Sequence, residues 1–145
     1  MNRKTWLRVG VVCVVAVACI YLRMNQFRPK TIGIYHTARP SGYAMTTRRK
    51  EPPRLTFGLE GRFQLTEIEV VPLAEWQTNH LALPAWHLVS ESGSDPVSRF
   101  SYGQHIRGME PAVAGAQPQP LQPDVTYRLF VTAGRMKGQH DFEIK

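Results

Sequence analysis

Hydrophobic and polar positions divide the chain into two contrasting regions. From Val9 to Leu22, fourteen consecutive residues carry no charge, and Arg8 and Arg23 close the run on either side. After Leu55 the apolar residues fall in short runs separated by turn residues, and no long helical stripe recurs. A long uncharged run is typical of a membrane helix, whereas short runs between turn residues favour strands. The pattern predicts one apolar N-terminal helix followed by an all-β domain.

The N-terminal run is interpreted as a single-pass membrane anchor over residues 1–24. Trp6 to Met24 provides nineteen positions, close to the roughly twenty residues that cross a bilayer core. A cleaved signal peptide is the main alternative, because Ala16–Ala18 fits the small-x-small cleavage pattern after a positively charged start. The apolar residues Ile20–Leu22 argue against cleavage there, and a buried core helix is the third interpretation.

The net charge of +7 is unevenly distributed. Residues 1–50 hold ten Lys/Arg and no Asp/Glu, whereas residues 51–145 hold eight Lys/Arg against eleven Asp/Glu. A nucleic-acid-binding domain carries its basic charge on the folded part, so this distribution argues against a nucleic-acid partner. It suits the flank of a membrane, where Lys and Arg contact anionic lipid. Membrane lipid is therefore the expected partner of the N-terminal region.

Residues 25–54 are interpreted as a basic, Pro-containing tether. Arg48–Lys50, Pro52 and Pro53 lie near its end, and only Thr31–Tyr35 has the composition of a short strand. An extended linker of this length would hold the following domain some tens of ångströms from the membrane.

The positions of the cysteines and the charges on either side of the apolar run help to predict on which side of the membrane the domain lies. Cys13 and Cys19 both lie in the apolar run, so residues 55–145 hold neither a disulfide nor a cysteine metal site. The positive-inside rule gives no clear orientation, because Lys and Arg flank both sides of the run. The start of the chain resembles an export signal. We therefore expect the domain outside the cytoplasm.

Six strands are predicted within one domain at residues 55–145. Their ranges are Leu55–Leu59, Leu65–Pro72, Ala85–Ser90, Val97–Tyr102, Val125–Ala133 and Gln139–Ile144. The clearest is the fifth, in which Val125, Tyr127, Leu129 and Val131 occupy alternate positions and so share one face. Strands of this kind bury their apolar faces when two sheets pack into a β-sandwich.

The segment LQPDVTYRLFV resembles a signature of the fibronectin type III family. Leu121, Pro123, Tyr127 and Val131 match its Leu-x-Pro-x-x-x-Tyr-x-x-x-Val pattern, and Asp124 stands where glycine is usual. The resemblance implies an immunoglobulin-like β-sandwich with a tyrosine corner. In that corner the ring of Tyr127 enters the core and its hydroxyl bonds a backbone group upstream. A resemblance of this kind supports a fold and not a function.

The residues that carry catalysis or bind metals form no recognised motif. No two of the five histidines stand at the i, i+4 spacing of a helical zinc motif, and no Gly-x-Ser-x-Gly elbow is present. Glu67 and Glu69 share one side of a predicted strand and are interpreted as exposed carboxylates. We therefore predict no catalytic, metal or cofactor site. The remaining enzyme hypothesis, a hydrolase-type site, uses His80, His87 or His105 with a carboxylate.

The leading functional hypothesis is a non-catalytic domain that a membrane anchor presents to a partner protein. The candidate contact residues are Trp76, Trp86, Tyr102, Gln104, His105 and Arg107. The competing interpretation of both tryptophans is that they belong to the core. A carbohydrate- or cell-wall-binding module is the alternative function, with Trp76 as a stacking platform for a glycan.

Overall fold

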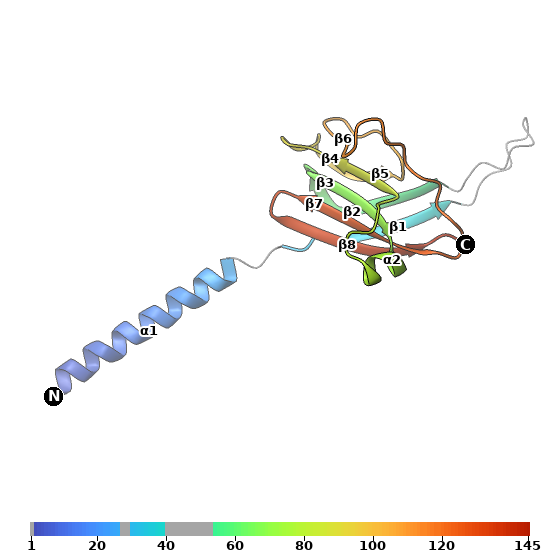
Figure 1. Cartoon of the computed structure of the whole chain (residues 1–145). Coiled ribbons are helices and arrows are strands. Elements are labelled where there is room, and N and C mark those ends of the chain that lie inside the picture. Colours follow the sequence, from blue (N-terminus) through green and yellow to red (C-terminus); the bar gives the residue numbers. More distant parts are fainter. Residues whose placement is uncertain (1, 27–29, 40–53) are drawn as a thin grey trace, which may run out of the picture.

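Two antiparallel β-sheets and one long N-terminal helix make up the protein (Figure 1). The computed structural model describes residues 2–26, 30–39 and 54–145. The elements are α1 (Arg3–Gln26), β1 (Ile34–Arg39), β2 (Arg54–Phe63), β3 (Glu67–Pro72), α2 (Leu73–Thr78), β4 (Trp86–Val89), β5 (Val97–Ser101), β6 (Glu110–Pro111), β7 (Thr126–Ala133) and β8 (Met136–Glu143). The smaller sheet has the order β1-β2-β5, and the larger sheet has the order β6-β4-β3-β7-β8. The predicted all-β domain behind an apolar helix is confirmed.

The six predicted strands correspond to β2, β3, β4, β5, β7 and β8. The alternation that predicted the fifth strand is observed in β7, where every second residue from Tyr127 to Ala133 is buried. Because β7 pairs with β3 on one side and with β8 on the other, it is an interior strand of the larger sheet. The two-residue strand β6 is too short to leave an alternation in the sequence, and it was not expected.

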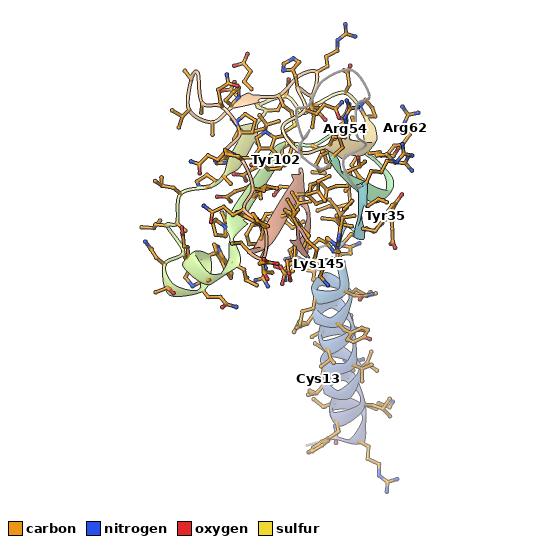
Figure 2. The ribbon with its side chains drawn as sticks, turned by 90° about the vertical axis from the view of Figure 1, so that its right-hand side faces the viewer. Cys13, Tyr35, Arg54, Arg62, Tyr102 and Lys145 are labelled. Atoms are coloured by element: carbon orange, nitrogen blue, oxygen red, sulfur yellow. The ribbon has the colours of Figure 1, made fainter. Side chains whose placement is uncertain are left out.

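Helix α1 lies apart from the sheets, and none of its residues is buried. Its 24 residues extend about 36 Å at 1.5 Å per residue, which is enough to cross a bilayer core. Its side chains, Cys13 among them, project outward along the whole helix (Figure 2). The interpretation of this segment as a buried core helix is therefore wrong. Length and composition make α1 a candidate membrane span.

The structure departs from the predicted tether, because the chain joins the sandwich soon after α1. Thr31 forms a parallel bridge with Lys137 of β8, and the Ile32 amide donates to the Lys137 carbonyl at 3.0 Å. Strand β1 then pairs along its whole length with β2. Four Cα–Cα steps separate Gln26 from Lys30 and span at most about 15 Å, so residues 25–54 do not form one long spacer. Their basic and proline-rich end, residues 48–53, lies outside the described residues.

Side chains from both sheets meet in one apolar core. Phe57 of β2 lies 5.6 Å from Phe100 of β5 and packs edge-on against Phe142 of β8 at 5.0 Å between ring centroids. Leu129 of β7 is fully buried and belongs to the same core cluster. Contacts between large aromatic rings bury much apolar area and add a specific geometric preference. This core fixes the edges and end loops on which a site can be built.

Candidate functional site

A groove with a volume of about 420 Å³ follows the edge of the larger sheet at β4. Its walls are residues 83–88, 103–105, 111–113 and 116–119. The far wall is held by backbone hydrogen bonds, because the Ala112 amide donates to the His87 carbonyl at 3.1 Å and the Gln119 amide donates to the Ala85 carbonyl at 2.8 Å. The loop after β6 therefore covers the edge of β4 at two points and leaves a hollow between them.

Tyr102 does not line the groove, but its hydroxyl contacts backbone carbonyls in two of the groove's walls. Its hydroxyl lies 2.7 Å from the Gln119 carbonyl oxygen and 3.2 Å from the Ala85 carbonyl oxygen, and its ring packs edge-on against Trp86 at 5.3 Å. Burial raises the pKa of the Tyr102 phenol, with a smaller contribution from Tyr127. The phenol therefore stays protonated over the whole physiological range and remains a donor to these carbonyls.

The rim of the groove carries exposed aliphatic side chains. Leu83 is 82% exposed and Val113 is 70% exposed, and both residues line the groove. Leu81, two residues before Leu83, is 87% exposed but does not line it. No Asp, Glu, Lys or Arg is among the lining residues. Neighbouring exposed aliphatic residues around an uncharged hollow are typical of a surface that binds an apolar segment.

The structure brings some of the predicted contact residues to this groove and leaves others elsewhere. Trp86, Gln104 and His105 line it, and Tyr102 lies behind its wall. Trp86 is only 4% exposed and belongs to the core, as the competing interpretation held. Arg107 lies outside the lining, and its exposed guanidinium is 3.9 Å from Asp95.

Trp76 lies away from the groove, in a cluster on the outer face of the larger sheet. The Arg128 guanidinium lies 5.1 Å from the centre of the Trp76 ring, and Phe130 and His80 pack against the same ring at 5.4 Å and 4.6 Å. Asp141 binds Arg128 through two hydrogen bonds of 2.6 Å and 2.8 Å. Hydrogen bonding to Arg128 lowers the pKa of Asp141. Trp76 thus holds α2 on the sheet, and its ring is already in contact with three side chains.

The predicted pair Glu67 and Glu69 does share the outer face of β3, where both lie opposite β4. Glu67 Oε1 accepts a hydrogen bond from His87 Nε2 at 2.8 Å. Burial raises the pKa of Glu69, while the nearby His87 opposes that effect. A His–carboxylate pair can serve as a general base, but no Ser, Thr or Cys of the described residues hydrogen-bonds to His87. The described chain also has no group of three metal-ligating side chains.

A second histidine pair was missed because one partner lies in the range interpreted as a tether. His36 Nδ1 of β1 lies 2.7 Å from His140 Nε2 of β8. By register His36 lies on the same face of its sheet as Phe57, and His140 lies on the same face as Leu129. His36 is nevertheless exposed and His140 is half-buried, so the pair lies at the open edge between the two sheets. The available signal in the sequence was the alternation of Ile32 and Ile34, of which Ile32 is buried and Ile34 is half-buried.

The residues of the fibronectin-type pattern surround the start of β7. The Tyr127 hydroxyl accepts a hydrogen bond from the Gln122 amide at 3.0 Å, and its ring stacks on Phe142 at 5.8 Å. Val131 is fully buried and Leu121 packs against the core from its edge, whereas Pro123 is exposed. Asp124 adopts a positive φ of 60° where the signature has glycine, so it bears the strain of a left-handed backbone.

Comparisons of the chain with family models, with curated proteins and with solved structures give no match. The fold and the groove define a small two-sheet β-domain that follows an apolar N-terminal helix.

Proposed function

We propose that this protein is a non-catalytic docking domain on a membrane anchor, and that its groove binds an apolar segment of a partner protein. The observation that carries the proposal is the exposure of Leu83 and Val113 on the walls of an uncharged groove. Exposed aliphatic side chains beside a hollow gain free energy when a partner removes them from water. A few side chains that enter a well-packed, desolvated pocket contribute most of the affinity in many protein interfaces.

The position of the groove supports a protein partner over lipid. The chain from α1 joins the larger sheet at β8, through the bridge between Thr31 and Lys137. The groove is lined by residues of β4 and β6. These two strands form the opposite edge of that sheet (Figure 1). A surface on the edge away from the membrane attachment is open to the water-soluble parts of neighbouring proteins.

We propose further that the sandwich is immunoglobulin-like, of the fibronectin type III kind. The order β1-β2-β5 corresponds to strands A, B and E, and the order β4-β3-β7-β8 corresponds to C′, C, F and G of such folds. Tyr127 then lies at the start of strand F, where the tyrosine corner belongs. The hydrogen bond from the Gln122 amide to its hydroxyl supports this assignment. Edges and end loops are the surfaces that these sandwiches offer to partners.

The domain is proposed to lie outside the cytoplasm, since the basic start before the apolar run resembles an export signal. A cysteine introduced at exposed Ala114 tests this orientation in intact cells. A membrane-impermeant maleimide labels it if the domain is outside, and fails to label it until the cells are lysed if the domain is inside.

The docking proposal is tested with two acidic substitutions in the groove. We expect Leu83→Asp together with Val113→Asp to reduce the amount of partner that co-purifies with the full-length protein from native membranes by about tenfold or more. Leu81→Asp is the matched control, because Leu81 is equally exposed but does not line the groove. Equal partner recovery with all variants would exclude the groove. A protein that purifies alone but is retained by an immobilised glycan would favour the carbohydrate-binding alternative.

A further inference from the structure

The end of the sandwich next to α1 is held close to any membrane that α1 enters. Four Cα–Cα steps lie between Gln26 and Lys30 and span at most about 15 Å. The next residue, Thr31, is already bridged to β8 at Lys137. The β7–β8 turn at this end of the sandwich therefore faces α1 (Figure 1). The connection between β2 and β3 lies at the same end, since the Thr66 amide donates to the Thr132 carbonyl at 2.8 Å.

Basic side chains gather at this end of the sandwich. They are Lys30, Arg62, Arg135 and Lys137, all exposed, and none forms a salt bridge with another described residue. Arg62 projects away from the sheets (Figure 2). The carboxylates at the same end are Glu60, Glu67, Glu91, Asp95 and Glu110. Two of them already have partners, since Glu67 lies 2.8 Å from His87 and Asp95 lies 3.9 Å from Arg107. The four cations therefore outnumber by one the three carboxylates without a salt bridge among the described residues, which are Glu60, Glu91 and Glu110. Residues 51–145 as a whole carry a net negative charge.

Apolar side chains lie between these cations. Phe63 at the end of β2 and Met136 at the start of β8 are each partly buried against the core and partly exposed. A surface that combines exposed Lys or Arg with partly exposed apolar side chains matches the headgroup region of a bilayer, where phosphate and the upper acyl chain are both within reach.

We propose that this end, formed by Lys30, Arg62, Phe63 and the turn from Arg135 to Lys137, binds anionic phospholipid headgroups. The inference depends on the membrane anchoring in the proposed function, but it concerns a surface at the other edge from the groove. Bound headgroups would hold the sandwich in one orientation on the bilayer. The groove would then face a fixed direction along the membrane.

The test uses the full-length protein in liposomes of phosphatidylcholine, with or without about 30% phosphatidylglycerol. In a variant with Cys13 and Cys19 replaced by Ala, a fluorescent probe is attached at Gln64→Cys in the β2–β3 connection, or at Ala114→Cys beyond β6. A nitroxide on the lipid headgroup quenches nearby probes. We expect quenching at Gln64 to be at least about twofold stronger than at Ala114 on anionic liposomes, and to weaken in high salt.

Charge variants identify the cause of the quenching. The triple substitution Arg62→Gln, Arg135→Gln and Lys137→Gln is expected to return the quenching at Gln64 on anionic liposomes to its value on neutral liposomes. The matched control removes three cations elsewhere, with Arg54→Gln, Arg99→Gln and Lys145→Gln, and is expected to have no effect.

Any of three results would overturn the inference. Quenching that is equal at both probe positions would show that this end does not face the lipid. Quenching that is equal on both lipids and unchanged by the first triple substitution would show that the short connection alone holds the end near the bilayer. Flotation of the full-length protein with liposomes is measured in parallel. Its absence would refute the membrane anchor, whereas flotation without quenching at Gln64 would refute only the headgroup-binding surface.

Discussion

His36 Nδ1 lies 2.7 Å from His140 Nε2, and this hydrogen bond joins the edges of the two sheets. It requires at least one neutral imidazole, because two imidazolium rings have only donors and repel each other. Burial lowers the pKa of His140, and the charge of His36 lowers it further, while Asp141 opposes these effects. The folded state therefore binds a proton at His140 less readily than the unfolded chain does.

We expect the stability of the sandwich to fall as the pH decreases below the ordinary histidine pKa of 6.5. The contribution of His140 is fully present above that pH, where the imidazole is neutral in both states, and is lost as the pH falls through its folded pKa. The loss is about 1 kcal/mol at most, because solvent screens this partly exposed pair. Thermal unfolding between pH 7.5 and pH 5 measures it, with His140→Gln and the control His105→Gln. Identical pH profiles for the wild type and His140→Gln would contradict the expectation.

Ser94 is a buried polar residue of the loop before β5, with 2% of its surface exposed. Its hydroxyl accepts a hydrogen bond from the Leu65 amide at 2.9 Å and donates to the Asp95 carbonyl at 2.8 Å. We expect Ser94→Ala to destabilise the domain by about 1–3 kcal/mol, because the Leu65 amide is left unpaired in the interior. Exposed Ser92→Ala is the control. Equal chemical denaturation curves for these two variants would show that the Ser94 hydroxyl does not matter.

The Tyr127 hydroxyl is expected to stabilise the turn before β7. Tyr127→Phe keeps the ring in the core but removes the acceptor of the Gln122 amide. We expect a loss of about 1 kcal/mol in the free energy of unfolding. Tyr35→Phe is the control, because Tyr35 is 46% exposed and has no such partner among the described residues. A larger loss with the control would refute the role of the corner.

Gly138 of β8 is expected to be essential for the contact between β8 and the chain that leaves α1. A Cβ at this position would lie 2.6 Å from the Ile32 carbonyl oxygen and close to the Ile32 side chain. Gly138→Ala should therefore displace residues 31–32 and destabilise the domain by about 1–3 kcal/mol. Amide hydrogen exchange at Ile32, which bonds to the Lys137 carbonyl, should accelerate. Unchanged protection of that amide would mean that the contact is not maintained in solution.

The sequence was sufficient to predict the strands whose side chains alternate, and α1 with its uncharged run. It predicted only a short strand at Thr31–Tyr35 and did not predict that β1 extends to Arg39 and joins a sheet, because Gly33 and the surrounding basic residues resemble a linker. Residues 40–53 separate β1 from β2 in the sequence. The local pattern of hydrophobic residues cannot predict that these two separated segments pair.

The groove was not predictable in the same way. Its walls come from three loops that meet only after β4, β5 and β6 have packed. In the sequence Leu83 and Val113 resemble ordinary core residues, whereas Trp86 and Trp76 attract attention as aromatic contact candidates. Packing reverses these roles, since Trp86 is buried and the two aliphatic side chains are exposed. Burial is decided by tertiary contacts, and residue type alone does not determine it.

Site-specific photo-crosslinking from the groove tests the central claim most directly. A photoreactive phenylalanine analogue replaces Leu83 or Val113 in the full-length protein in native membranes, and replaces exposed Arg99 of β5 as the control. The account predicts that one protein partner is captured from both groove positions and not from Arg99, and that Leu83→Asp abolishes capture from Val113. Capture from Arg99 with none from either groove position would contradict it.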